Sequence, residues 1–216
     1  MENNISLVSG AKGGVGKSLV TMGLLDYLKD RNAALLETDV ANPDVGKSYS
    51  KEVSKFAGLD IAHEEAWIDL ANFLEKTKSP VVINAAAGLG SSNSVKNLGD
   101  GLSELERDLR VFWILNTQKD GLNLLKSFLD EVEGSERIKV HAVRNTFFGT
   151  PDDFRLFNEG LKGRIIDRGG GHSRLSGPCQ AMRRTSLRRA AFHCPGGRGL
   201  PVRESAGTSE MASACS

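Results

Sequence analysis

The sequence predicts an α/β protein in which a mostly parallel central sheet carries helices on both faces. Three observations lead to this fold class. A glycine-rich run at residues 10–18 follows a short apolar segment and precedes a helix-forming one. Short apolar runs then alternate with helical segments, as they do when strands are buried in a parallel sheet. A length of 216 residues suits one such domain.

The elements can be placed by their hydrophobic patterns. We expect strands at residues 5–9, 33–38, 81–84, 111–116 and 138–143, where apolar and β-branched residues form short runs. Helices are expected at residues 18–31, 63–76, 121–133 and 151–161. Residues 88–101 are rich in Gly, Ser and Asn, which favours a mobile loop. Gly46-Lys47-Ser48 lacks preceding glycines and an apolar strand, so we expect a solvated loop there.

The glycine-rich run has the residue types of a phosphate-binding loop. Its glycines let backbone amides approach phosphate oxygens without a Cβ in the way. The helix that follows adds the positive end of its dipole. Lys17 would reach the β- and γ-phosphates, and the Ser18 hydroxyl would bind Mg²⁺. Lys12 stands before the glycines, where an ordinary loop of this type requires no lysine.

Polar residues close the predicted strands. In open parallel sheets, ligands bind beyond the carboxyl ends of the strands, so these side chains are candidates for one site. They are Glu37, Asp39, Asn84, Asn116, Arg144 and Asn145.

The composition favours a cytoplasmic protein that does not enter a membrane. No run is long and apolar enough to cross a bilayer. The first residues are acidic and amide-bearing and lead directly into a strand, which is unlike a signal peptide.

The composition changes after about residue 165. All lysines lie at or before Lys162, whereas residues 163–216 contain every cysteine and nine arginines against three acidic residues. We therefore expect a domain at residues 1–165 and an atypical Arg/Gly/Ser-rich tail at residues 166–216. The tail is consistent with a disordered arm that binds nucleic acid, a bland extension, or a shifted reading frame, which we favour. The cysteines match no metal-binding spacing.

The run Lys12-Gly13-Gly14-Val15-Gly16-Lys17-Ser18 resembles the deviant Walker A loop of the ParA/MinD family, over about residues 1–165. The resemblance implies a P-loop NTPase three-layer sandwich that binds Mg-ATP through Gly13, Gly14, Val15, Gly16, Lys17 and Ser18. It also implies a homodimer formed around ATP. Lys12 would then contact the phosphates bound by the partner subunit and stabilise developing charge, as an arginine finger does.

Two predicted strands extend the resemblance. Leu35-Leu36-Glu37-Thr38-Asp39 is similar to the family's strand ending in Asp-x-Asp; Asp39 would help to position the attacking water and the metal shell, and Glu37 replaces the usual first aspartate. Residues 81–84, followed by Ala87-Gly88, resemble the Walker B strand and turn. Asn84 replaces the Walker B aspartate and brings no charge. We therefore expect weak Mg²⁺ binding and slow hydrolysis, which Asn84→Asp should raise.

The resemblance also includes Asn145 and places its side chain against the adenine ring, because an amide edge both donates and accepts hydrogen bonds. Family members of this size resemble ATPases of plasmid partition or conjugative mobilisation. We expect an ATP-dependent dimerisation switch with a protein partner or nucleoprotein cargo, and with weak or indirect DNA contact. Two alternatives remain within the superfamily, a non-hydrolysing nucleotide-binding adaptor and a metabolic P-loop ligase. A nucleic-acid-binding protein that uses the arginine tail is a third.

Overall fold

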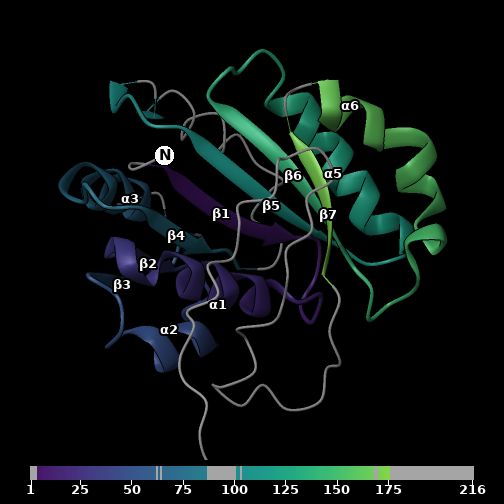
Figure 1. Ribbon diagram of the computed structural model, residues 1–216. Helices are drawn as coiled ribbons and strands as arrows, with labels where there is room; N and C mark the ends of the chain where they lie inside the picture. Colours follow the sequence, from purple (N-terminus) through teal and green to yellow (C-terminus); the bar gives the residue numbers. More distant parts are fainter. Residues whose placement is uncertain are drawn as a thin grey trace, which may run out of the picture.

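The chain forms a seven-stranded sheet in which every strand pair is parallel (Figure 1). The computed structural model describes residues 4–61, 63, 65–86, 101–102, 104–167 and 170–175. The strand order is β3-β2-β4-β1-β5-β6-β7. The strands are β1 (Ile5–Gly10), β2 (Ala34–Glu37), β3 (Phe56–Gly58), β4 (Val81–Asn84), β5 (Leu109–Leu115), β6 (Ile138–Asn145) and β7 (Gly171–Leu175).

The helices join these strands as crossovers. They are α1 (Lys17–Leu28), α2 (Asp44–Tyr49), α3 (Glu65–Lys76), α5 (Lys119–Glu131) and α6 (Lys162–Asp167). The remaining elements are two short 3-10 helices, η1 (Lys29–Arg31) and η2 (Pro151–Asp153), and one π-helical turn, η3 (Phe157–Leu161). Among the described residues, no helix has the length and hydropathy needed to span a bilayer.

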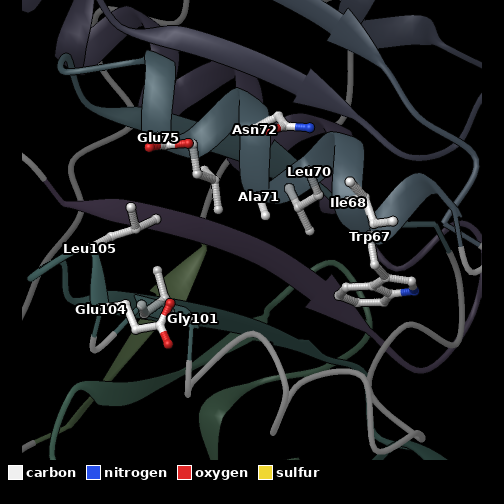
Figure 2. Close-up of a pocket in the computed structure, with 11 residues that line it drawn as sticks. Trp67, Ile68, Leu70, Ala71, Asn72, Glu75, Gly101, Glu104 and Leu105 are labelled. Carbon is white, nitrogen blue, oxygen red and sulfur yellow. The ribbon is translucent and has the colours of Figure 1, made fainter.

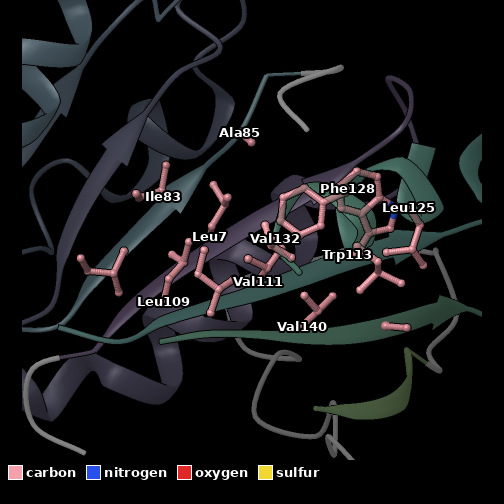
Figure 3. Packing of buried hydrophobic residues seen from close by; sticks show 14 of the residues in the cluster. Leu7, Ile83, Ala85, Leu109, Val111, Trp113, Leu125, Phe128, Val132 and Val140 are labelled. Atoms are coloured by element: carbon pink, nitrogen blue, oxygen red, sulfur yellow. The ribbon is translucent and has the colours of Figure 1, made fainter. Parts of the chain in front are cut away.

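Two buried clusters cover the two faces of the sheet, because alternate residues of a strand point to opposite sides. On β1, Leu7 belongs to one cluster and Val8 to the other. The first cluster packs the sheet against α3 and α5, and Figure 3 shows Leu125 and Phe128 of α5 over Val111 and Trp113. The second cluster packs the opposite face against α1 and α2. The three-layer α/β sandwich expected from the sequence is therefore confirmed.

Four elements differ from the predictions. Residues 46–48 were expected in a loop, but they lie in α2, where the buried Val45 side chain joins the second cluster. The expected helix at residues 151–161 is instead divided into η2 and η3. The edge strands β3 and β7 were not expected, since three and five residues give too little periodicity.

The sheet also extends past the boundary expected at residue 165, because β7 pairs with β6. The expected tail beyond Leu175, and the expected loop at residues 88–101 except for Gly101, lie outside the described residues.

The described part contains a cavity of about 620 Å³ beside α3 (Figure 2). Its lining residues come from α3 and from the segment that begins at Gly101; none belongs to the glycine-rich loop. Figure 2 shows Trp67 at one end of this cavity and Leu105 towards the other.

Candidate functional site

The glycine-rich loop connects β1 to α1 and needs glycine at two positions. Gly14 has a φ of 75° and Gly16 a φ of 107°, in the left-handed region that side-chain-bearing residues rarely adopt. Gly16 is also the N-cap of α1. Apart from chain neighbours, no atom of the described residues lies within 4 Å of the positions that a Cβ would take at Gly13 or Gly14. The loop therefore presents open backbone at a helix N-terminus, which is the arrangement that binds anions.

Val15 fixes the loop to the sheet. Its side chain is buried, and a Cβ on Gly10 would lie 2.9 Å from Val15 Cγ2. Its carbonyl oxygen accepts a 2.8 Å hydrogen bond from Nδ2 of Asn145, at the end of β6. Asn145 Oδ1 accepts another hydrogen bond from the Phe147 amide. The side chain expected at the adenine ring thus holds the loop through its Nδ2, while its Oδ1 is engaged by the turn that follows β6.

Lys17 turns back over the loop. Its Nζ donates a 3.0 Å hydrogen bond to the Lys12 carbonyl oxygen, and the residue is only 9% exposed. Desolvation lowers the pKa of Lys17, and the negative charge of Asp39 partly opposes this shift. An ammonium held across the loop in this way can contact anionic oxygens bound by the loop amides. Ser18 follows it in the first turn of α1 and is half-buried.

Lys12 points in a different direction. Its Nζ lies 2.9 Å from Asp120 Oδ2 and 3.4 Å from Gln118 Oε1, at the start of α5. Half of the Lys12 side chain is exposed. The hydrogen bond and charge of Lys12 lower the pKa of Asp120. The two lysines of the loop therefore face different surroundings, one folded over the loop and one at the surface.

A buried hydrogen-bond network joins β2, β4 and α1. Asn84 Nδ2 donates to Glu37 Oε1 over 2.7 Å. Thr21 Oγ1 lies 2.9 Å from Asn84 Oδ1 and 3.0 Å from the Lys17 carbonyl oxygen, so its single proton is shared. Glu37, Asn84 and Thr21 are all at most 3% exposed. This network places the end of β4 in contact with the first turns of α1.

Asp39 lies just beyond β2 and is half-buried. Its Oδ1 accepts a 3.2 Å hydrogen bond from the Asn42 amide. Asp39 lies close enough to Lys17 for its charge to raise the pKa of the lysine, against the effect of burial. The predicted site residues Lys17, Asp39 and Asn84 thus lie around the start of α1.

Two of the strand-end candidates take part in other contacts. Asn116 Oδ1 accepts a 3.1 Å hydrogen bond from the Gln118 amide and so shapes the turn into α5. Arg144 Nη1 donates to Asn158 Oδ1 over 3.0 Å, on the side of η3. The expected gathering of all strand-end residues at one site is therefore not found for Arg144.

Thr21 is the residue of this region that the sequence reasoning missed. It lies four residues after Lys17 and belongs to the buried side of α1. A hydroxyl on that side of a helix requires a partner, and this signal was available in the sequence. The replacement of the usual aspartate by Glu37 was recognised from the sequence, but the contact of Glu37 with Asn84 was not expected.

Comparison with known proteins identifies the family. No family model matches the chain. It is 42% identical over 176 residues to Protein MobD of Acidithiobacillus ferrooxidans, an overlap that covers 79% of this chain and 76% of the relative. The chain belongs to the MobD family.

Solved structures show the same fold at low sequence identity. A nucleotide-binding protein from Archaeoglobus fulgidus in complex with ADP superposes with a TM-score of 0.52 at 14% identity, covering 80% of this chain and 81% of that one. A plasmid partition protein from Borrelia burgdorferi gives 0.52 at 14% identity, with coverage of 73% and 85%. The signal recognition particle receptor FtsY from Elizabethkingia anophelis gives 0.53 at 14% identity, with coverage of 88% and 62%. These similarities place the MobD-family chain in the P-loop NTPase fold.

Proposed function

We propose that this chain is a deviant Walker A ATPase of the ParA/MinD type, which binds Mg-ATP and uses it to form a homodimer. The observation that carries the proposal is the divergence of the two loop lysines. Lys17 is folded over its own loop, whereas Lys12 extends along the surface to Asp120. The first arrangement suits binding of a phosphate by the same subunit, and the second leaves a cation at the surface for a partner.

The chain would hold the triphosphate through the loop. The backbone amides of Gly13, Gly14, Val15, Gly16, Lys17 and Ser18 are the proposed contacts. The left-handed glycines support this role because they turn the backbone, and the open space beside Gly13 and Gly14 admits a ligand. Lys17 adds its ammonium at the β- and γ-phosphates. Asn145 is proposed to act at the adenine side while it anchors Val15.

Mg²⁺ would be held near the start of α1 by Ser18, Asp39 and Asn84. Their donor set is oxygen-based, which is what Mg²⁺ prefers. Among the residues that the structure describes, no three His, Cys, Asp or Glu side chains form a metal-binding group. A magnesium ion that takes most of its ligands from phosphates and water needs no such group. When bound, the ion would neutralise charge on the phosphates.

Hydrolysis would be slow and would depend on dimerisation. Lys12, Lys17 and Asp39 are the proposed catalytic residues: the lysines stabilise phosphoryl charge and Asp39 orients water. Asn84 supplies no charge at the Walker B position, which supports a low rate. The same feature favours the second candidate, a nucleotide-binding adaptor that does not hydrolyse ATP.

The cellular role proposed is plasmid partition or conjugative mobilisation in the cytoplasm. It is supported by the MobD relative and by the fold shared with a plasmid partition protein. The partner would be a protein or a nucleoprotein complex, with DNA contacted weakly or indirectly. We also propose that the part of the chain that ends with β7 provides the ATPase, and that the arginine-rich residues beyond it are not needed.

Calorimetric titration with Mg-ATP tests the proposal. Wild type should bind ATP, and Lys17→Ala should abolish binding because its ammonium is the main cation of the loop. Lys29→Ala, an exposed lysine at the end of α1, is the matched control and should bind as wild type does. Equal ATP affinity in wild type and Lys17→Ala would refute the assignment of the site.

A further inference from the structure

Glu37 and Asn84 end neighbouring strands at the same level of the sheet. They are directly paired in the parallel register of β2 and β4, and their side chains meet over 2.7 Å between Oε1 and Nδ2. An aspartate would be usual at Asn84, by the resemblance of β4 to a Walker B strand. Here β4 carries the amide, and the neighbouring strand carries a carboxylate long enough to reach it.

The Glu37 carboxylate is fully buried, and the contacts that the described residues make with it are neutral. It is 0% exposed, and its hydrogen-bond donors are neutral: Asn84 Nδ2, the Gly46 amide over 3.3 Å, and the Asp39 amide. Within the part of the chain that the structure describes, no ion pair reaches Glu37. Burying an ionised carboxylate without a cation is costly.

The location of the Glu37 carboxylate indicates which cation could balance its negative charge. Asn84 Oδ1 contacts Thr21, which in turn contacts the carbonyl oxygen of Lys17. The side chains of Asn84 and Thr21 therefore connect Glu37 to the backbone of Lys17. A divalent cation at the start of α1 would lie on this side of the loop and would supply the missing positive charge.

We propose that Glu37 supplies the carboxylate charge for Mg²⁺ that Asn84 lacks, and that Asn84 is the positioning residue that orients Glu37. This inference rests on the proposed function of the loop as an ATP site. It also changes the expectation for Asn84→Asp. With Glu37 present, that variant places two carboxylates in contact and removes the donor between them, so it should weaken Mg²⁺-dependent binding.

The test compares ATP affinity in Mg²⁺ with affinity in EDTA for four proteins: wild type, Glu37→Gln, the exchange variant Glu37→Gln/Asn84→Asp, and Glu65→Gln. The last removes an exposed glutamate of α3 and is the matched control. In Glu37→Gln, the enhancement of ATP affinity by Mg²⁺ should fall by about 10- to 100-fold, which is the usual effect of removing a side chain that supports a metal's ligands. The affinity of this variant for ATP in EDTA should be unchanged. The exchange variant should regain most of the enhancement. Thermal unfolding without ligand checks that each variant is folded.

The outcomes separate the two proposals. If wild type fails to bind ATP in both buffers, the proposed function is wrong. If wild type binds ATP but Mg²⁺ gives no enhancement, or Glu37→Gln keeps the full enhancement, the role of Glu37 is wrong. If the exchange variant folds but shows as little enhancement by Mg²⁺ as Glu37→Gln, the proposed role of Glu37 is also contradicted. Should that variant not fold, Glu37→Gln alone decides.

Discussion

Asn145 Nδ2 donates a 2.8 Å hydrogen bond to the carbonyl oxygen of Val15, which connects the end of β6 to the middle of the glycine-rich loop. The two residues are 130 positions apart in the sequence. Both are buried, so the bond is shielded from competing water. The shape of the loop therefore depends on a strand two places away from β1 in the sheet.

Replacing Asn145 separates its two possible roles. Asn145→Ala removes the support of Val15, so affinity for ATP and for inorganic tripolyphosphate should fall by the same factor. Competition binding with both ligands measures this. Asn158→Ala removes an amide that contacts Arg144 rather than the loop, and it is the matched control. A loss for ATP alone would assign Asn145 to the adenine ring instead.

Thr21 should contribute to stability through its hydroxyl. Thr21→Val keeps the shape of the side chain but leaves Asn84 Oδ1 without its donor in a buried site. We expect a loss of about 1–3 kcal/mol in the free energy of unfolding, measured by denaturant titration. Thr21→Ser retains the hydroxyl and should lose less. If the two variants are equally stable, the methyl group rather than the hydrogen bond is important.

The contact between Lys12 and Asp120 should restrain the lysine weakly, since both side chains are at least half exposed. Asp120→Asn frees Lys12 and should strengthen ATP-dependent dimerisation by no more than a few-fold, because exposed ion pairs contribute little. Sedimentation equilibrium at low and high salt measures the effect, which should shrink as salt is added. A dimer that is lost in Asp120→Asn would show that Asp120 is part of the interface.

His141 should make the fold less stable in acid. It stacks on Phe112 with ring centroids 5.3 Å apart. Burial, followed by the charges of Arg110 and Lys139, lowers its pKa below the ordinary 6.5. Between the lowered pKa and 6.5 the unfolded chain binds more protons, so stability rises with pH across that window and falls on acidification.

Replacing His141 tests whether it causes this loss of stability on acidification. His141→Gln should show a smaller fall in the free energy of unfolding as pH decreases through the same window. His63→Gln changes an exposed histidine and serves as the control. The same slope in wild type and His141→Gln would contradict the assignment.

Much of the fold could be predicted because its central strands are buried on both faces. The short apolar runs within Ile5–Gly10, Ala34–Glu37 and Val81–Asn84, where every position is buried, reflect this directly. Glycine spacing likewise predicted the loop, whose conformation needs glycine at positions 14 and 16. The edge strands β3 and β7 are too short to show a period, and α2 depends on tertiary contacts of Val45 and Gly46.

The candidate site was less predictable because its key contacts join distant strands. The sequence indicated that Asn84 lacks a charge, but only the paired register of β2 and β4 shows Glu37 beside it. In the same way, Asn145 could be placed at a strand end, while its contact with Val15 required the sheet order. The residue types indicated the chemistry of the candidate site, whereas the order of the strands determined which side chains are in contact.

The central claim is that Lys12 makes ATP a signal for dimerisation, and light scattering of wild type and Lys12→Ala in Mg-ATP tests it most directly. Wild type should change from monomer to dimer on addition of ATP. Lys12→Ala should bind ATP with nearly the same affinity and remain monomeric. Dimerisation of Lys12→Ala at the same ATP concentration as wild type would contradict the account.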